Sequence, residues 1–284
     1  MSTTSLSPPP ARTQSLVLRH PLISFFVLTY AAAWLLWAPL VIFRDRVPGP
    51  LAFILLLLGS LVPSTVGVVL VALLRGRSGV RTLLGRLLRA RIGVRWYLAV
   101  LALAMLAPLA VGVSVLMGGT TPVVDNTILG VLFLFAFMIF PGSAVGEEIG
   151  WRGFALPRMQ ARHSALKASL VLGILWGSWH LPLWLTGTEG HPISLFVPFV
   201  LAVIATSVIC TWLYNGTGGS LLIIVLFHAA INLPITVLIT PLGSQMAQPF
   251  LIYVALAIVA AVIIVIVTGA EHLSRTTQRQ IEQP

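Results

Sequence analysis

Residues 249–268 read PFLIYVALAIVAAVIIVIVT, a run of twenty residues without a charged side chain. A helix of about 20 residues crosses a hydrocarbon core of about 30 Å, so this run predicts a transmembrane helix. Comparable apolar runs recur along the whole chain. Together they predict eight spans, at residues 21–43, 50–74, 96–117, 128–147, 168–186, 195–214, 220–239 and 249–268.

The composition excludes an ordinary soluble domain. Apolar residues make up 58% of the 284-residue chain and charged residues only 8%, and the mean hydropathy is +1.01. No polar segment between the apolar runs is long enough to form a domain of its own. The sequence therefore predicts an all-α fold, a polytopic transmembrane helical bundle of about eight spans.

The positive charges are distributed unevenly between the two sides of this predicted bundle. Of the 17 Lys and Arg residues, 15 precede the first span, lie between the second and third, or follow the fourth or the eighth. Only Arg44 and Arg46 fall in the loops of the other side. Because Lys and Arg concentrate in cytoplasmic loops, both termini are predicted to be cytoplasmic. The net charge of +10 then indicates membrane lipids as partners and argues against a nucleic acid.

The chain divides into four parts. Residues 1–18 are rich in Ser, Thr and Pro and predict a disordered cytoplasmic tail. Residues 19–127 hold the first three spans, and residues 128–240 hold the next four together with most of the polar residues at membrane depth. Residues 241–284 are predicted to form the last span and a second cytoplasmic tail.

The segment between the second and third spans, residues 75–95, reads RGRSGVRTLLGRLLRARIGVR. Four leucines would share one face of a helix here, surrounded by arginines. Such a basic amphipathic helix is typical of a segment that lies on the membrane surface, and the alternative is a docking surface for an acidic partner. The four leucines are Leu83, Leu84, Leu87 and Leu88.

The first polar cluster, GEEIGWRGFALPRMQ at residues 146–160, is predicted at the cytoplasmic end of the fourth span. Glu148 and Arg152 are four residues apart, so on a helix they share a face and can form an ion pair. Glu147 points about 100° away from Glu148, which leaves its carboxylate free for general acid or base catalysis. The alternative interpretation is a solvated cytoplasmic loop with an ordinary ion pair.

The second cluster, WGSWHLPLW at residues 176–184, lies inside the fifth predicted span. Trp176 and His180 are four residues apart and share a helical face. A charged side chain at membrane depth costs about 2.5–3.5 kcal/mol on insertion scales, so ionisable residues there usually mark function. A hydrogen-bonded core histidine is the structural alternative.

The third cluster, LFHAAINLP at residues 226–234, lies in the seventh predicted span. His228 and Asn232 are again four residues apart and project from one helical face. An Asn alone is often a device for hydrogen bonding between membrane helices. A His with an Asn one turn away, combined with the other two clusters, favours a functional site.

Two imidazoles, a free carboxylate and an amide suit the hydrolysis of an amide or ester. No Ser or Cys stands in a recognisable nucleophile setting, so the pattern favours direct attack by an activated water. Glu147 could take the proton of that water, with His180 helping to position it. His228 and Asn232 could donate hydrogen bonds to the oxyanion that forms on the carbonyl.

The same residues leave a metal site open as an alternative. Two His and one Glu with a water form a catalytic zinc shell, so Glu147, His180 and His228 could hold Zn²⁺. The His-Glu-x-x-His helix typical of zinc peptidases is missing from the sequence. The sequence is equally compatible with a metal-free water.

Three motifs in this order resemble those of the CPBP family: Glu-Glu-x-x-x-Arg at 147–152, Trp-x-x-x-His at 176–180 and His-x-x-x-Asn at 228–232. This family contains the CAAX prenyl endopeptidases and the bacterial Abi or bacteriocin-immunity-type proteins. The resemblance covers about residues 128–240 and implies an intramembrane protease core there. The family is commonly described as one of metalloproteases, and a glutamate-dependent mechanism without metal has also been argued.

The resemblance also implies a role for each matching residue. Glu147 matches the catalytic glutamate, and His180 matches the histidine that works with it on water. His228 and Asn232 match the pair that stabilises the oxyanion. Trp176 stands where the second motif often has Phe, which is expected to affect substrate shape more than chemistry. The residues expected to organise the site are Glu148, Arg152 and Trp176.

We therefore expect a hydrolase of the cell membrane, an intramembrane endopeptidase that acts on a membrane-associated protein or peptide. A multi-pass protein of the bacterial inner membrane is the expected location. The alternative is a noncatalytic immunity-type scaffold or binding protein that uses the same polar residues. A proton-coupled transporter finds no support, since no internal repeat is visible.

Overall fold

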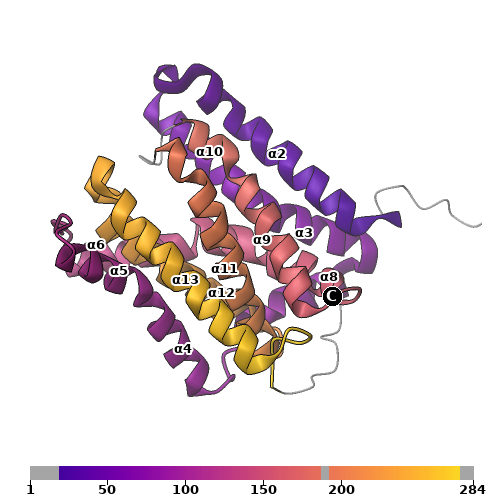
Figure 1. Ribbon diagram of the computed structural model, residues 1–284. Coiled ribbons are helices and arrows are strands. Elements are labelled where there is room, and N and C mark those ends of the chain that lie inside the picture. The colour runs from indigo at the N-terminus through magenta and orange to yellow at the C-terminus, as the bar shows by residue number, and fades with distance from the viewer. Residues whose placement is uncertain (1–18, 187–191, 276–284) are drawn as a thin grey trace, which may run out of the picture.

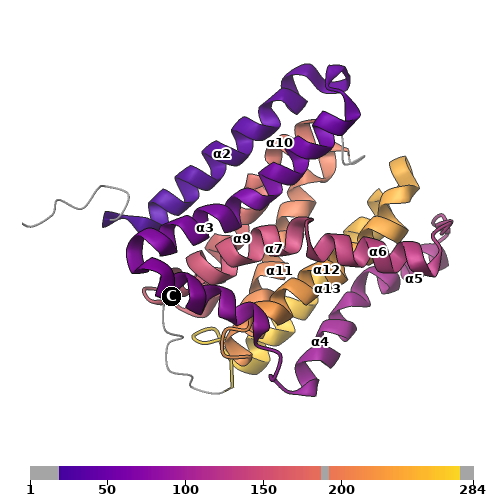
Figure 2. The same cartoon turned by 180° about the vertical axis from the view of Figure 1, so that it is seen from behind.

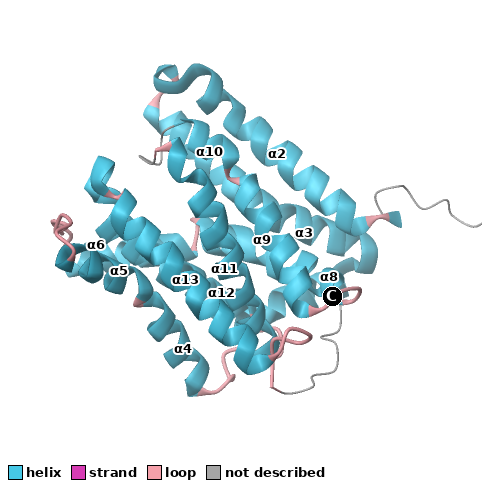
Figure 3. Cartoon of the chain, viewed as in Figure 1, coloured by secondary structure: helices cyan, strands magenta, loops and turns pink. Residues whose placement is uncertain are grey.

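The computed structural model describes residues 19–186 and 192–275, and within these ranges it contains helices and loops but no strand (Figure 3). The predicted tail at 1–18 and the last part of the second tail lie outside the described residues. The helices are α2 (Pro21–Phe43), α3 (Gly49–Gly85), α4 (Val94–Ala104), α5 (Leu106–Leu116), α6 (Ile128–Ile139), α7 (Ser143–Glu148), η3 (Ile149–Ala155), α8 (Leu156–Gln160), α9 (Ala165–Trp179), α10 (Leu181–Thr186), α11 (Phe196–Gly216), α12 (Leu221–Pro234), η5 (Ile235–Ile239) and α13 (Ala247–Thr268).

The described residues form eight helical segments that are long and apolar enough to cross a membrane, which confirms the predicted transmembrane bundle. Each segment overlaps one of the predicted spans. Several segments contain two or more consecutive helices separated by a bend in the chain, such as α4 and α5. The segments are Pro21–Arg46, Gly49–Leu88, Val94–Leu116, Ile128–Gln160, Ala165–Thr186, Ile193–Gly216, Leu221–Gln245 and Ala247–Thr268.

The ends of the bundle separate the loops into two groups. In Figure 1 the start of α2 lies at the right, α8 at the lower right and the end of α13 at the bottom, whereas the connection from α2 to α3 lies at the upper left and that from α5 to α6 at the left. Eight crossings would bring both ends of the described chain to the same side. That this side faces the cytoplasm stays a prediction from the distribution of Lys and Arg.

The fourth span is longer than predicted. Instead of ending at Glu147, it breaks after α6 and continues through α7, η3 and α8 to Gln160. The break follows from Pro141, which lacks an N–H group and clashes with the preceding helical turn. The alternative interpretation of the first polar cluster as a solvated cytoplasmic loop is wrong for Arg152. Its side chain is fully buried inside the bundle.

The interpretation of residues 75–95 as one surface helix is also wrong. α3 bends at Gly76, whose φ of 65° is accessible mainly to glycine, and the helix ends at Gly85. The segment 89–93 is not helical. Leu83 is fully buried within the bundle, whereas Leu88 is 84% exposed, so the four leucines do not form one lipid-facing stripe.

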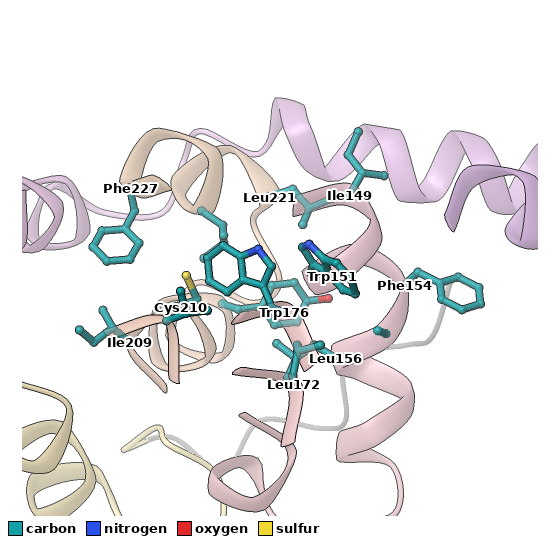
Figure 4. Packing of buried hydrophobic residues seen from close by; sticks show 14 of the residues in the cluster. Ile149, Trp151, Phe154, Leu156, Leu172, Trp176, Ile209, Cys210, Leu221 and Phe227 are labelled. Carbon is teal, nitrogen blue, oxygen red and sulfur yellow. The ribbon is translucent and has the colours of Figure 1, made fainter. Parts of the chain in front are cut away.

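The core is centred on α11, which packs against both α9 and α13. A Cβ atom on Gly173 of α9 would lie 2.7 Å from Ile204 Cα, so α9 and α11 approach closely where glycine stands. Small residues allow this contact between membrane helices. Figure 4 shows Trp176, Cys210 and Phe227 among the buried side chains of the cluster that these helices share.

Candidate active site

α7 lies against α3, and this contact sets the position of the two glutamates (Figure 2). Gly146 and Gly150 are four residues apart on the face that meets α3. A Cβ atom on Gly146 would lie 2.7 Å from the carbonyl oxygen of Ser60, and one on Gly150 would lie 2.3 Å from that of Pro63. The two glycines therefore permit backbone contact between the helices, as small residues at this spacing do in membrane proteins.

The π-helix η3 begins directly after Glu148, and all seven of its residues are buried. π-helical turns within α-helices are rare and frequently occur at functional sites. Within this wider turn Arg152 lies inside the bundle, close to the glutamates, and not in the solvated loop of the alternative interpretation. The local backbone is thus part of what assembles the polar cluster.

Glu148 is the centre of a buried charge network. Nη1 of Arg152 lies 2.9 Å from each carboxylate oxygen of Glu148, which confirms the predicted ion pair. Nδ1 of His228 lies 2.7 Å from Oε1 of the same carboxylate. The contact with His228 joins α12 to the first motif, and the sequence spacing did not predict it.

Glu147 has a different environment, although it is the neighbouring residue. Its side chain is buried, and Oε2 accepts a hydrogen bond from Nε1 of Trp176 at 2.5 Å. The direct partner is therefore a neutral indole N–H rather than a cation. This agrees with the expectation that Glu147 and Glu148 point in different directions.

Trp176 connects the site residues more closely than the sequence indicated. Besides binding Glu147, its ring lies 4.0 Å from the guanidinium carbon of Arg152. The ring centroids of His228 and His180 lie 5.5 and 6.3 Å from that of Trp176. The indole thus contacts residues of all three motifs, in line with the expectation that Trp176 helps to organise the site.

His180 lies at the junction of α9 and α10. Pro182 follows two residues later and cannot continue the hydrogen bonds of α9. Nδ1 of His180 lies 2.9 Å from the carbonyl oxygen of Trp176. Because a carbonyl only accepts, Nδ1 carries the proton, and in the neutral ring Nε2 has a lone pair that can accept one.

His228 is buried between α7 and α12. Because its Nδ1 donates to the Glu148 carboxylate, a second donation from Nε2 requires the imidazolium form. Oγ of Ser143 lies 3.4 Å from Nε2, a long contact. Sequence reasoning missed Ser143, because it stands outside the three motifs and no spacing links it to His228.

Asn232 is half-buried on α12, one turn beyond His228. Within the described residues its side chain makes no hydrogen bond, so its amide N–H groups are available to a ligand. The helical spacing puts it on the same face as His228.

The zinc interpretation requires Glu147, His180 and His228 to converge. Across residues 19–186 and 192–275, no three side chains of His, Cys, Asp or Glu are arranged so that they could hold a metal ion. One oxygen of Glu147 is occupied by Trp176, whose ring lies beside both imidazoles. The side chains as placed do not fit Zn²⁺, and no step proposed below involves a metal.

Comparisons with known proteins cover this same part of the chain. Residues 128–234 match the family described as Type II CAAX prenyl endopeptidase Rce1-like. The CAAX prenyl protease 2 of Methanococcus maripaludis is 34% identical over 97 residues, which are 32% of this chain and 36% of that protein. The chain thus matches about a third of the length of this curated relative. All seven predicted site residues lie within the segment that matches the family.

Proposed function

We propose that this chain is a membrane protease that hydrolyses a peptide bond, because its segment 128–234 matches the Rce1-like CAAX prenyl endopeptidase family. The observation that carries the proposal is the separation of two adjacent carboxylates. Glu148 is bound by both Arg152 and His228, whereas within the described residues the one hydrogen-bond partner of the Glu147 carboxylate is the neutral N–H of Trp176. A carboxylate held in this way is suited to proton transfer.

In the proposed mechanism Glu147 is the general base. Oε2 is held by Trp176, and Oε1 takes a proton from a water whose oxygen attacks the scissile carbonyl carbon. Nε2 of His180 accepts the water's second hydrogen bond and orients it, because Nδ1 is fixed on the Trp176 carbonyl. Glu147 then returns its proton to the amine as the C–N bond breaks, so that no proton is gained or lost.

The negative charge on the carbonyl oxygen needs donors. We assign this role to Nε2 of His228, as imidazolium, and to the amide of Asn232. Glu148 supports the charge of His228 through the 2.7 Å contact at Nδ1. One such donor is worth about 2.7–4 kcal/mol of transition-state stabilisation in known enzymes.

The proposed substrate is a membrane-associated protein or peptide, because the site residues lie within membrane-spanning segments. The relative from Methanococcus maripaludis is named a CAAX prenyl protease. For this chain we propose the broader class only. The proposed location is the cell membrane, the inner membrane of a bacterium, with both termini in the cytoplasm.

The proposal is tested by comparing the termini of membrane proteins in cells that express the wild type, Glu147→Gln or Glu271→Ala at matched levels. Glu147→Gln keeps an acceptor for Trp176 but removes the base. Glu271→Ala is the matched control, because it removes an exposed carboxylate. The hydrogen bond from the Ala165 N–H goes to the backbone oxygen of residue 271, so this change keeps it. New termini in the wild type and the control, but not in Glu147→Gln, are expected. Identical termini in all three would contradict proteolysis and favour the noncatalytic binding protein.

A further inference from the structure

The regular hydrogen bonds of α9 stop at its end, where His180 lies. In a continuous α-helix the carbonyl oxygen of Trp179 would accept the N–H of Leu183. Here the N–H of Leu183 donates to the carbonyl oxygen of His180 instead, at 3.0 Å, and Pro182 carries no N–H. The Trp179 carbonyl therefore requires a donor from elsewhere, because an unpaired backbone group inside a membrane is costly.

The neighbouring helix α2, which lies beside α10 in Figure 1, supplies this donor. Nε1 of Trp34 donates to the carbonyl oxygen of Trp179 at 3.0 Å. This carbonyl belongs to the peptide group that links Trp179 to His180. The N–H of the same peptide group donates to the carbonyl oxygen of Gly177 at 3.2 Å. The peptide group before His180 is thus held at both ends, once within α9 and once from another membrane-spanning segment.

The orientation of this peptide group determines where the imidazole of His180 can reach. The Cα atom of His180 is attached directly to it, and Nδ1 of the ring lies 2.9 Å from the Trp176 carbonyl oxygen. The rings of Trp179 and Phe199 flank the imidazole at centroid distances of 4.8 and 5.1 Å. A rotation of the peptide group would move Nδ1 away from the Trp176 carbonyl, and the tautomer with a lone pair on Nε2 would no longer be fixed.

We propose that Trp34 is a positioning residue, which fixes the orientation and the tautomer of His180 through the peptide group between Trp179 and His180. The inference rests on the proposed function, in which Nε2 of His180 orients the attacking water. It extends the site to α2, which precedes the segment 128–234 that matches the protease family. The first spans then contribute to the geometry of the site as well as to the bundle.

Trp34→Phe and Tyr30→Phe are a matched pair of variants on consecutive turns of α2. Each change removes one donor to α9 and keeps an aromatic ring. The hydroxyl of Tyr30 donates to the carbonyl oxygen of Leu175 and lies 2.9 Å from Oγ of Ser178, so it does not bind the peptide group before His180. Tyr30→Phe therefore measures the effect of a weaker contact between α2 and α9, without the assigned role.

The first readout requires no substrate. The full-length chain is purified in detergent with isotope-labelled histidine, and two-bond proton–nitrogen correlation spectra report the tautomer of each imidazole, with His180→Gln assigning the signals of His180. The wild type and Tyr30→Phe are expected to show His180 with its proton on Nδ1 alone, and Trp34→Phe is expected to show both tautomers. A mixture in the wild type, or a single tautomer in Trp34→Phe, would overturn the proposal.

The second readout separates this inference from the proposed function. With a substrate identified from the comparison of termini, Trp34→Phe is expected to lower kcat about three- to tenfold, the effect of losing one hydrogen bond, and to leave KM within about twofold. Tyr30→Phe is expected to leave kcat within about twofold. Equal kcat values in the two variants would overturn the role of Trp34 while proteolysis stands. The expected tautomers without cleavage by the wild type would overturn proteolysis, whereas the positioning of His180 would stand.

Discussion

The hydrogen bond from Trp176 to Glu147 gives the sharpest test of the proposed mechanism. Trp176→Phe removes the Nε1–H donor but retains an aromatic ring beside Arg152 and the two histidines. If this bond holds Glu147 in its reactive orientation, the change lowers kcat even though no proposed catalytic residue is altered.

The magnitude follows from the kind of bond that is lost. A hydrogen bond to a charged group is worth about 1.5–3 kcal/mol, which corresponds to a fall in kcat of about 10- to 150-fold. The contact with Arg152 weakens by about 0.5 kcal/mol or less, since Phe also attracts a cation. KM is expected to stay within about threefold, because Trp176 orients the base and is not assigned to substrate binding.

The assay uses purified protein in proteoliposomes and a substrate identified from the comparison of termini. Trp151→Phe is the matched control, because Trp151 is also fully buried but its Nε1 makes no hydrogen bond in the described part of the chain. Both variants replace a buried indole by the smaller phenyl ring, and thermal unfolding measures the loss of stability that the two have in common. A Trp176→Phe enzyme with the kcat of the Trp151→Phe enzyme would refute the role of the bond.

Three further predictions concern the supports of the site. Gly150→Ala places a methyl group 2.3 Å from the Pro63 carbonyl oxygen, so it should lower the free energy of unfolding by about 1–3 kcal/mol, measured by thermal unfolding. Gly112→Ala is the control and should leave the stability unchanged, because its methyl group would meet no atom within 4 Å. Glu148→Gln leaves Arg152 buried without its anion, so the free energy of unfolding should fall by about 3–5 kcal/mol. Thermal unfolding measures this change, and an unchanged Tm would contradict the prediction. Ser143→Ala loses only a 3.4 Å contact and should change kcat less than about threefold, so a larger loss would indicate a direct role.

The number and order of the spans could be predicted because bilayer thickness sets the length of an apolar helix. The end of the fourth span could not. Three charged residues within six positions, Glu147, Glu148 and Arg152, are typical of the start of a polar loop when the sequence alone is considered. In the structure Glu148 and Arg152 compensate each other and are buried, so the helix continues to Gln160.

Within the site, the sequence predicted only contacts along one helix. The pair of Glu148 and Arg152 follows from the spacing of four residues alone. The bonds from Trp176 to Glu147 and from His228 to Glu148 join different helices, so they depend on how those helices pack. That packing is set by close approaches such as the one between Gly150 and Pro63, which no motif spacing encodes.

The division of roles between the two glutamates follows from these cross-helix contacts. A carboxylate bound to both Arg152 and His228 stays ionised, because taking up a proton would leave a buried positive charge without compensation. Glu148 is therefore a poor base. Glu147 is oriented by a dipole instead of a charge, so it can gain and lose a proton without breaking an ion pair. The same motif thus supplies one carboxylate to hold the site together and another that is free to react.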